Sequence, residues 1–372
     1  MQFAVLNEEA QGENRVALVP DSIKLLLKQK HAVLVQSGAG AAASIPDAQF
    51  QAAGARIVAD AAELLGMADC LLKIRPVSIE DAQAVPEGKA LIGLLAPLRH
   101  PALVQILAQR RLTSFSLDAI PRISRAQSMD ILSSMATIAG YRAVLLAASH
   151  MPKFLPMLTT AAGTIRPAQG LILGAGVAGL QAIATARRLG AVVEAFDVRP
   201  AVKEQVQSLG AVFIEIPVAE NPEDKGGYAK QVSAETLTQQ QKLLYQRAML
   251  ADFIISTAQV PGKPAPRLIT KAMVADMKPG SVIVDLAAET GGNCEWTQAD
   301  QIVRHNGVTI LGPTNLPATL PLDASRMFGR NLASFIQEIT NEKGFTMDWK
   351  NEIFVQTCIT FNGETNAQRR AA

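Results

Sequence analysis

The chain has 372 residues, of which 49% are apolar and 18% are charged, and its mean hydropathy is +0.17. This composition excludes an intrinsically disordered chain, and at about 150 residues per domain the length suggests two or three packed domains. The 35 Lys and Arg against 33 Asp and Glu give a net charge of +2, with no basic block, so nucleic acid is not an expected partner.

Targeting and cysteine patterns narrow the cellular setting. The first residues, MQFAVLNEEAQGENR, are acidic where a secretory signal needs a basic stretch and then an apolar run. Apolar runs are all interrupted before the roughly 18 residues that a bilayer-spanning helix needs, so we expect a soluble chain. Cys70, Cys294 and Cys358 are far apart and form no C-x-x-C pair, which predicts no disulfide framework and no metal site, and favours a reducing compartment.

Strand and helix patterns alternate through the first third of the chain. One helix-like segment begins at Pro20-Asp21, where Asp21 is expected to act as the N-cap. The alternation is typical of a doubly wound α/β domain. The expected strands are residues 3–6, 32–36, 70–74, 90–95 and 113–117.

A longer helical pattern follows from about residue 128 to residue 150, with Ile131, Met135 and Ile138 on one face. We expect this helix to connect two domains. A second long helix, expected at residues 325–340, returns the chain to the first domain. The polar tail, residues 361–372, is expected to be frayed.

The α/β pattern restarts near residue 169, with strands expected at residues 170–173, 192–197, 212–217, 252–258, 281–287 and 308–313. We therefore predict an α/β protein with two doubly wound parallel-sheet (Rossmann-like) domains joined by long helices. The outer domain would comprise residues 1–130 with 325–372, and the second Rossmann-like domain residues 131–324. The polar segment 218–241 is too long for an ordinary connection, which leaves a functional mobile loop or a disordered insertion as alternatives.

The strongest local motif is the glycine-rich turn at Gly174, Gly176 and Gly179, between an expected strand and an expected helix. The first glycine permits a tight turn, the second lets the backbone approach a pyrophosphate, and the third lets helix and strand pack closely. Asp197 lies 18 residues beyond Gly179, at the end of the next strand, where a carboxylate accepts hydrogen bonds from an adenosine ribose. The pattern predicts a dinucleotide site.

The residues around this motif indicate which dinucleotide binds. The Asp197 carboxylate repels a 2′-phosphate, so NAD(H) should be preferred over NADP(H). A nearby Arg199 can accommodate that phosphate, but we favour a surface cation or a partner for the adenine. Neighbouring positions expected to line the nucleotide are Ala175, Val177, Val198 and Thr257.

A second polar constellation occupies residues 121–134, in the sequence PRISRAQSMDILSS. One interpretation is a helix start, because Ser124 and Gln127 have capping-box spacing and Ser128 is a natural N-cap. The other is a ligand site, because arginines, an amide, a carboxylate and hydroxyls at a domain junction suit a nicotinamide and its ribose.

These motifs together resemble one family. Residues 121–144, the GAGVAG turn with Asp197, GGYAK at 226–230, PGKPAP at 261–266 and VDLAAETGGNCE at 284–295 are similar to the NAD(H)-binding component of proton-translocating NAD(P) transhydrogenases, which share their architecture with alanine dehydrogenases.

The resemblance implies direct hydride transfer from NADH bound here to NADP⁺ on a partner component, coupled to proton translocation by a membrane-spanning subunit. It also implies a homodimer in the cytoplasm, peripheral on the inner face of the cell membrane. By the same resemblance, Arg122, Gln127, Asp130 and Ser133 surround the nicotinamide, Asp197 holds the adenosine ribose, and residues 226–230, with Gly227 and Tyr228, form a loop that closes over the nucleotide. Val232 stands where members often have Met.

Alanine dehydrogenase is the main alternative function. That reaction needs proton transfer as well as hydride transfer, hence a positioned acid or base. The chain resembles those enzymes at Arg15 and Lys73, but residues 94–97 contain no His and the expected Asp is Glu289. Hydride transfer between two nicotinamides needs only aligned rings and excluded water. A non-catalytic NAD-sensing module is a third possibility.

Overall fold

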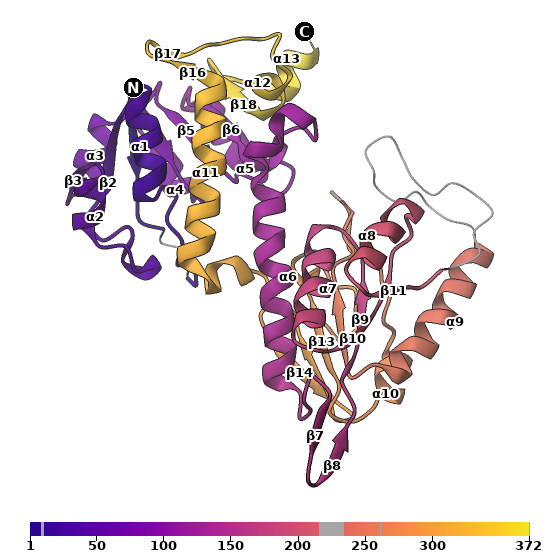
Figure 1. Ribbon diagram of the computed structural model, residues 1–372. Coiled ribbons are helices and arrows are strands. Elements are labelled where there is room, and N and C mark those ends of the chain that lie inside the picture. Colours follow the sequence, from indigo (N-terminus) through magenta and orange to yellow (C-terminus); the bar gives the residue numbers. More distant parts are fainter. Residues whose placement is uncertain (9–10, 216–233, 261, 372) are drawn as a thin grey trace. The chain divides into compact units, whose positions relative to one another are not determined.

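The computed structural model describes residues 1–8, 11–215, 234–260 and 262–371 (Figure 1). The chain divides into two compact units. Unit 1 consists of Met1–Met135 with Pro317–Ala372, and unit 2 of Ala136–Leu316. Each unit contains one large, mainly parallel sheet with its own helices, and the predicted Rossmann-like α/β class is confirmed.

Unit 1 is built on an eight-stranded sheet with the order β19-β18-β6-β5-β4-β1-β2-β3. Strands β1 to β6 are parallel, and β18 and β19 extend the sheet antiparallel beyond β6. The strands are β1 (Gln2–Val5), β2 (Ala32–Gln36), β3 (Arg56–Val58), β4 (Cys70–Leu72), β5 (Ala90–Gly93), β6 (Thr113–Ser116), β18 (Cys358–Phe361) and β19 (Glu364–Thr365).

The helices of unit 1 are mostly short, apart from α11. They are α1 (Pro20–Lys28), α2 (Asp47–Ala52), α3 (Ala61–Met67), α4 (Ile79–Ala84), α5 (Pro101–Gln109), α11 (Pro321–Ile339), α12 (Glu352–Thr357) and α13 (Asn366–Ala371). A small hairpin of β16 (Thr340–Asn341) and β17 (Gly344–Phe345) follows α11.

The cap predicted for the first helix is wrong. Helix α1 begins at Pro20, so Asp21 lies within the first turn and Val19 is the N-cap residue. The Ser22 hydroxyl accepts a hydrogen bond from Val19 N at 2.8 Å and so replaces the expected aspartate cap. Asp21 forms an exposed ion pair with Lys24 at 3.6 Å instead.

The prediction of a frayed C-terminal tail is also wrong. Strands β18 and β19 and helix α13 fold against the edge of the unit 1 sheet. The Thr360 hydroxyl donates to Leu112 O at 2.7 Å, and Arg369 Nη2 donates to Cys358 O at 2.9 Å. The polar composition of the tail hides this ordering because an edge strand needs few apolar side chains once its backbone is paired.

Unit 2 is built on a seven-stranded sheet with the order β11-β10-β9-β12-β13-β15-β14, in which only the edge strand β14 is antiparallel. The strands are β9 (Gln169–Leu173), β10 (Val192–Phe196), β11 (Val212–Phe213), β12 (Phe253–Ser256), β13 (Val282–Asp285), β14 (Ile302–His305) and β15 (Val308–Leu311). A separate hairpin consists of β7 (Leu158–Thr160) and β8 (Gly163–Ile165).

Helices cover both faces of the unit 2 sheet and bury two apolar clusters. The helices are α7 (Val177–Arg188), α8 (Lys203–Ser208), α9 (Ala234–Leu250), α10 (Lys271–Asp276) and the segment of α6 (Ile131–His150) beyond Met135. On β9, Ile172 joins the cluster that contains Ala143 and Ala182, whereas Leu171 joins the cluster that contains Leu244. Burial on both faces explains the nearly continuous apolar strands of the sequence.

Helix α6 begins in unit 1 and ends in unit 2. Among the residues described, it is the one helix long and apolar enough to span a membrane by length and composition, and 39% of its most apolar window is buried inside the protein. The core helices of proteins that never enter a bilayer meet the same test, so α6 is a weak indication of a membrane span.

Candidate functional site

The glycine-rich turn joins β9 to α7. Gly174 has φ +96, and a Cβ atom there would lie 2.5 Å from the Thr257 hydroxyl oxygen. Its backbone N–H donates to Phe196 O at 2.8 Å, which anchors the turn to β10. Both the positive φ and the close contact require glycine at this position.

The other two glycines of the motif differ in what surrounds them. A Cβ at Gly179 would lie 1.8 Å from Gly174 O, so close packing of helix on turn requires this glycine. A Cβ at Gly176 would have only one described atom within 4 Å, Nη2 of Arg199 at 3.9 Å. The backbone at Gly176, at the start of α7, is therefore accessible, as approach of a phosphate to a helix N-terminus demands.

The turn lies at the point where the strand order of unit 2 reverses. β9 is flanked by β10 on one side and β12 on the other, and ligands of open α/β sheets bind at the carboxyl ends of such strands. Thr257, just beyond β12, donates from its backbone N–H to Leu173 O at 2.8 Å and from its hydroxyl to Gly174 O at 3.1 Å. The turn and position 257 are thus adjacent.

Asp197 follows β10, and its side chain is only 6% exposed. Its Oδ2 accepts from Ala175 N at 2.7 Å, and its Oδ1 accepts from Arg199 N at 2.9 Å. The carboxylate is therefore fixed beside the glycine-rich turn. Of its neighbours, Val198 packs against the apolar cluster that contains Leu244.

Arg199 adopts a role that the sequence does not indicate. Its Nε donates to Asp197 Oδ1 and its Nη2 to Asp197 Oδ2, both at 2.9 Å, while its side chain is 24% exposed. A bidentate arginine–carboxylate pair is therefore present at the position expected for the ribose of the dinucleotide.

Sequence reasoning missed Asp285, the last residue of β13, which is fully buried. Its Oδ1 accepts from Ala287 N at 3.0 Å, while its Oδ2 accepts from Asn293 N at 2.7 Å, Cys294 N at 2.9 Å and the Thr297 hydroxyl at 2.6 Å. This carboxylate closes the loop after β13. The sequence signal for this residue is an acidic residue at the end of an otherwise apolar strand, with Gly-Gly-Asn beginning six residues later.

The side chain of Asn293 connects the loop after β13 to the loop after β12 by hydrogen bonds. Its side chain is buried, accepts from Ala258 N at 3.1 Å, and donates to Ala258 O and Pro266 O, both at 2.8 Å. Because Ala258 follows Thr257, hydrogen bonds connect Asp285 through Asn293 to the segment beside the glycine-rich turn. Gly292, with φ +86, is required there because a Cβ would lie 2.8 Å from Asp285 Oδ2.

The α-helix predicted to begin around residues 124–128 begins later, at Ile131 in unit 1. Residues Ser124–Met129 form a 3₁₀ helix whose N-terminus has no side-chain cap, so the capping-box interpretation is wrong. Asp130, rather than Ser128, caps α6: Ser133 N donates to Asp130 Oδ1 at 2.9 Å and the Ser133 hydroxyl to Oδ2 at 2.6 Å. The 3₁₀ helix delays the α-helix until Ile131, which leaves Asp130 at the capping position.

The remaining expected residues of this segment are at the surface of unit 1. Arg122 and Gln127 have exposed side chains. These two residues, with Asp130 and Ser133, belong to unit 1, whereas the glycine-rich turn and Asp197 belong to unit 2. Gly227 and Tyr228 of the expected loop lie outside the described residues.

Unit 1 has a reversal of strand order at β1 and β4, where charged residues gather. Lys73 Nζ donates to Asn7 O at 2.7 Å and lies 3.5 Å from Glu8 Oε2. Arg15 pairs with Glu13 at 2.6 Å, and both side chains are buried. Burial raises the pKa of Glu8, although Lys73 opposes this shift. The two alanine-dehydrogenase-like cations are thus each paired with a carboxylate.

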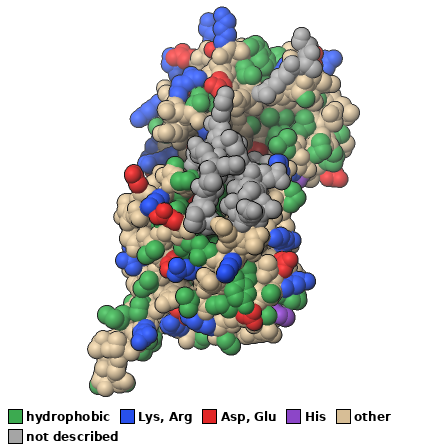
Figure 2. All heavy atoms as spheres, turned by 90° about the vertical axis from the view of Figure 1, so that its right-hand side faces the viewer, with side chains coloured by type: hydrophobic (Ala, Val, Ile, Leu, Met, Phe, Trp, Pro, Cys, Tyr) green, Lys and Arg blue, Asp and Glu red, His purple; other side chains and the backbone are tan. Residues whose placement is uncertain are grey.

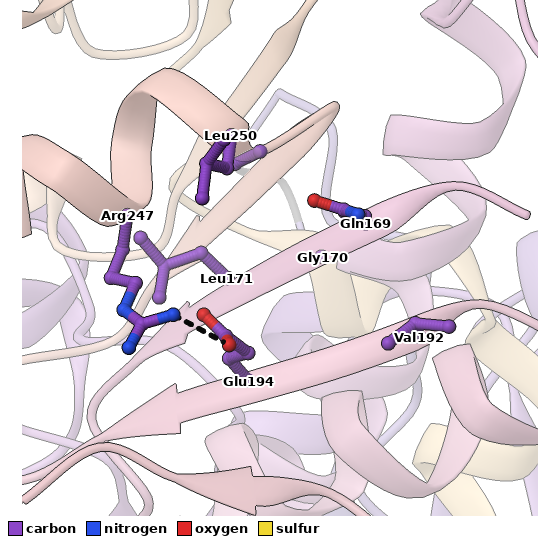
Figure 3. A pocket seen from close by; sticks show the side chains of 8 residues that line it. Gln169, Gly170, Leu171, Val192, Glu194, Arg247 and Leu250 are labelled. Carbon is purple, nitrogen blue, oxygen red and sulfur yellow. Dashed lines mark hydrogen bonds and ion pairs between the residues drawn. The ribbon is translucent and has the colours of Figure 1, made fainter.

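A cavity of about 160 Å³ lies elsewhere in unit 2, at the amino ends of β9 and β10 (Figure 3). It contains the ion pair of Arg247 with Glu194, at 3.0 Å. The glycine-rich turn follows the opposite end of β9, so this cavity is not the candidate site.

On the molecular face in Figure 2, Lys and Arg side chains occupy many separate places with acidic side chains between several of them.

Comparison with known proteins places the chain in a family. The family model for the N-terminal domain of alanine dehydrogenase/PNT matches residues 4–139, and the model for the C-terminal domain matches residues 143–368. The chain belongs to the alanine dehydrogenase/PNT family, as its sequence motifs indicate.

Individual relatives are more specific. The chain is 45% identical over 372 residues to the first section of NAD(P) transhydrogenase subunit alpha of Rhodospirillum rubrum, covering 98% of this chain and 97% of that protein. It is 30% identical over 349 residues to an alanine dehydrogenase of Halomonas elongata, covering 92% of this chain and 88% of the relative. The solved structure of a transhydrogenase from Sinorhizobium meliloti matches with a TM-score of 0.86 and 39% identity, over 98% of both chains.

These relatives settle the coarse class of the protein. The chain is of an oxidoreductase family, and its domains are those of nicotinamide nucleotide enzymes. The subunit names of the transhydrogenase relatives imply partner subunits.

Proposed function

We propose that this chain is the NAD(H)-binding component of a proton-translocating NAD(P) transhydrogenase. In this role NADH bound at the glycine-rich turn transfers hydride directly to NADP⁺ held by a partner component, and a membrane-spanning subunit couples the reaction to proton translocation. The single observation that carries the proposal is the carboxylate of Asp197, fixed beside an accessible Gly176 at the reversal of strand order.

We propose NAD(H) rather than NADP(H) as the nucleotide bound here. The Asp197 carboxylate suits a ribose diol and repels a 2′-phosphate. The turn supplies backbone N–H groups for the pyrophosphate, and Ala175, Val177, Val198 and Thr257 lie on the segments around it.

The nicotinamide end is assigned to the unit 1 segment. We propose that Arg122, Gln127, Asp130 and Ser133 orient the ring, and that Gly227 and Tyr228 close over the nucleotide. Hydride transfer between two nicotinamides exchanges no substrate proton, so these residues need only position the ring and exclude water. Such a site needs no acid–base histidine, and the four histidines lie outside the residues proposed for it. His31 contacts Phe3, His100 precedes α5, His150 ends α6, and His305 stacks on Trp296.

The proposed assembly is a homodimer that associates with a membrane-spanning subunit and an NADP(H)-binding component at the inner face of the cell membrane. The name of the relative from Rhodospirillum rubrum supports the association with other subunits alone, because it describes one section of a subunit alpha and so implies further sections and subunits.

Asp197→Asn tests the nucleotide site directly. The substitution keeps the shape but removes the charge that accepts the ribose hydroxyls, so we expect NADH to bind at least about tenfold more weakly. NADH fluorescence titration measures the dissociation constant, with Asp323→Asn as the matched exposed-carboxylate control. Equal affinity in wild type and Asp197→Asn would contradict the assignment.

Alanine dehydrogenase activity is the second candidate, favoured by the relative from Halomonas elongata and by Arg15 and Lys73. The isolated chain is incubated with alanine and NAD⁺, and NADH absorbance is followed. We expect no turnover, because the segment at residues 94–97 contains no acid–base histidine. Steady NADH formation would replace the transhydrogenase proposal with this one.

A further inference from the structure

The carboxylate of Asp197 has no vacant position for a ribose diol while Arg199 pairs with it. A carboxylate offers about four lone-pair sites on its two oxygens. Here the sites on Oδ1 receive Arg199 N and Nε, and those on Oδ2 receive Ala175 N and Arg199 Nη2, at 2.7 to 2.9 Å.

These four donors are of two kinds. The two backbone amides are fixed by the turn and by the chain after β10, so they hold the carboxylate in place without the guanidinium. The guanidinium is the end of a flexible side chain that is 24% exposed, and it can therefore leave. Two ribose hydroxyls can bind Asp197 only by taking the positions that Nε and Nη2 occupy.

We propose that Arg199 is a specificity-determining residue that competes internally with the nucleotide for Asp197. The inference rests on the proposed NADH site and deepens it. In the free protein the arginine closes the acidic side of the site, and NADH must open the pair before its ribose binds. The apparent affinity for NADH is then the affinity of the open form multiplied by the fraction of molecules in which the pair is open.

The guanidinium of Arg199 also favours the binding of NADPH, the nucleotide that carries a 2′-phosphate. Paired with Asp197 it cancels the charge that would repel a 2′-phosphate, and Arg is well suited to bind phosphate oxygens. Its Nη2 also lies 3.9 Å from the Cβ position of Gly176, so the cation is beside the turn where phosphates approach. Arg199 therefore narrows the discrimination between NADH and NADPH that Asp197 alone would give.

The test measures the dissociation constants of NADH and NADPH for wild type, Arg199→Ala and Arg199→Lys by fluorescence titration at one ionic strength. For Arg199→Ala we expect NADH to bind about two- to fivefold more tightly, because a partly exposed ion pair contributes up to about 1 kcal/mol. NADPH should bind more weakly, so the ratio of the two constants widens by at least about tenfold. Arg188→Ala, at the exposed end of α7, is the matched control and should behave as wild type.

Arg199→Lys separates charge from geometry. Lysine keeps the cation but lacks the planar fork, so its ratio of dissociation constants should lie between those of wild type and Arg199→Ala. NADH affinity in Arg199→Ala equal to or below that of wild type, or an unchanged ratio, would overturn the inference. Failure of the wild-type chain to bind NADH would instead refute the proposed function.

Discussion

Buried polar residues in this fold differ in how completely they are paired. Asp197 and Asp285 each accept four hydrogen bonds, whereas Nδ1 of the buried His31 has no partner among the described residues. The Thr340 hydroxyl donates to Ile336 O, so His31 Nε2 must be the donor in its 3.2 Å contact with Thr340. When His31 is neutral, its proton is therefore on Nε2, and Nδ1 is unprotonated.

The first residue-scale prediction concerns the pH dependence of stability. Burial lowers the pKa of His31 in the folded protein, so below about pH 6.5 the unfolded chain takes up a proton that the folded protein does not. The free energy of unfolding contributed by this group is full above that pH and falls as the pH decreases.

Urea unfolding at pH 7 and pH 5.5 measures the effect. His31→Phe removes the titrating group, so its stability should fall less between the two pH values than that of wild type. His100→Gln, at an exposed position, is the control and should keep the wild-type dependence. Identical pH dependence of wild type and His31→Phe would contradict the assignment.

Gln127 gives a prediction about positioning. If its amide orients the nicotinamide, Gln127→Asn should slow hydride transfer far more than it weakens NADH binding, because a shorter side chain misplaces the ring. Single-turnover rates with the NADP(H)-binding component and NADH titrations measure the two effects. Equal losses in both would mean that Gln127 only anchors the cofactor.

At the scale of elements, sequence patterns predict the buried parallel strands well and the edges poorly. The pattern predicts strand 32–36 with its observed limits because its side chains are mostly apolar. The short strands β3, β14 and β19 escape sequence prediction, since backbone pairing with a neighbour decides them. Helix starts fail at Asp21 and Ser128 because a cap depends on the turn that precedes the helix.

The candidate site is predictable only in part for the same reason. Gly174, Gly176 and Asp197 form a local pattern with a fixed spacing, so the sequence shows them. Asp285 and Asn293 act through contacts with distant loops, and the pairing of Arg199 with Asp197 depends on side-chain geometry. None of these has a sequence spacing of its own.

The loop after β13 gives the element-scale prediction. Asp285→Asn removes the buried charge that three donors share at Oδ2, so we expect a loss of about 2–4 kcal/mol in the free energy of unfolding. Because Asn293 connects this loop to Ala258, NADH affinity should fall as well. Urea unfolding and NADH titration measure both; unchanged values in either would contradict the proposed connection.

At the scale of the whole molecule, the proposed homodimer needs a surface for association. The hairpin of β7 and β8 pairs with no other strand among the described residues, and an isolated hairpin is at best marginally stable in water. Phe154, Met157 and Ile165, in and beside it, are 55%, 62% and 41% exposed. Clustered apolar exposure of this kind marks interaction surfaces.

We therefore expect the triple variant Phe154→Ser, Met157→Ser and Ile165→Ser to lower the dimer fraction in sedimentation velocity at micromolar concentration. Exposed Leu98→Ser in unit 1 is the control for a general loss of apolar surface. A monomeric wild type, or a triple variant as dimeric as wild type, would exclude this hairpin as the dimer contact.

The central claim is that this chain presents NADH to a second dinucleotide without acid–base chemistry of its own. The most direct measurement mixes the purified chain with the NADP(H)-binding component, NADH deuterated at the transferred C4 position and NADP⁺, and analyses the NADPH by mass spectrometry. The account predicts that the deuterium appears in NADPH and is not exchanged with water. NADPH formed without the label, or no NADPH at saturating nucleotide, would contradict it.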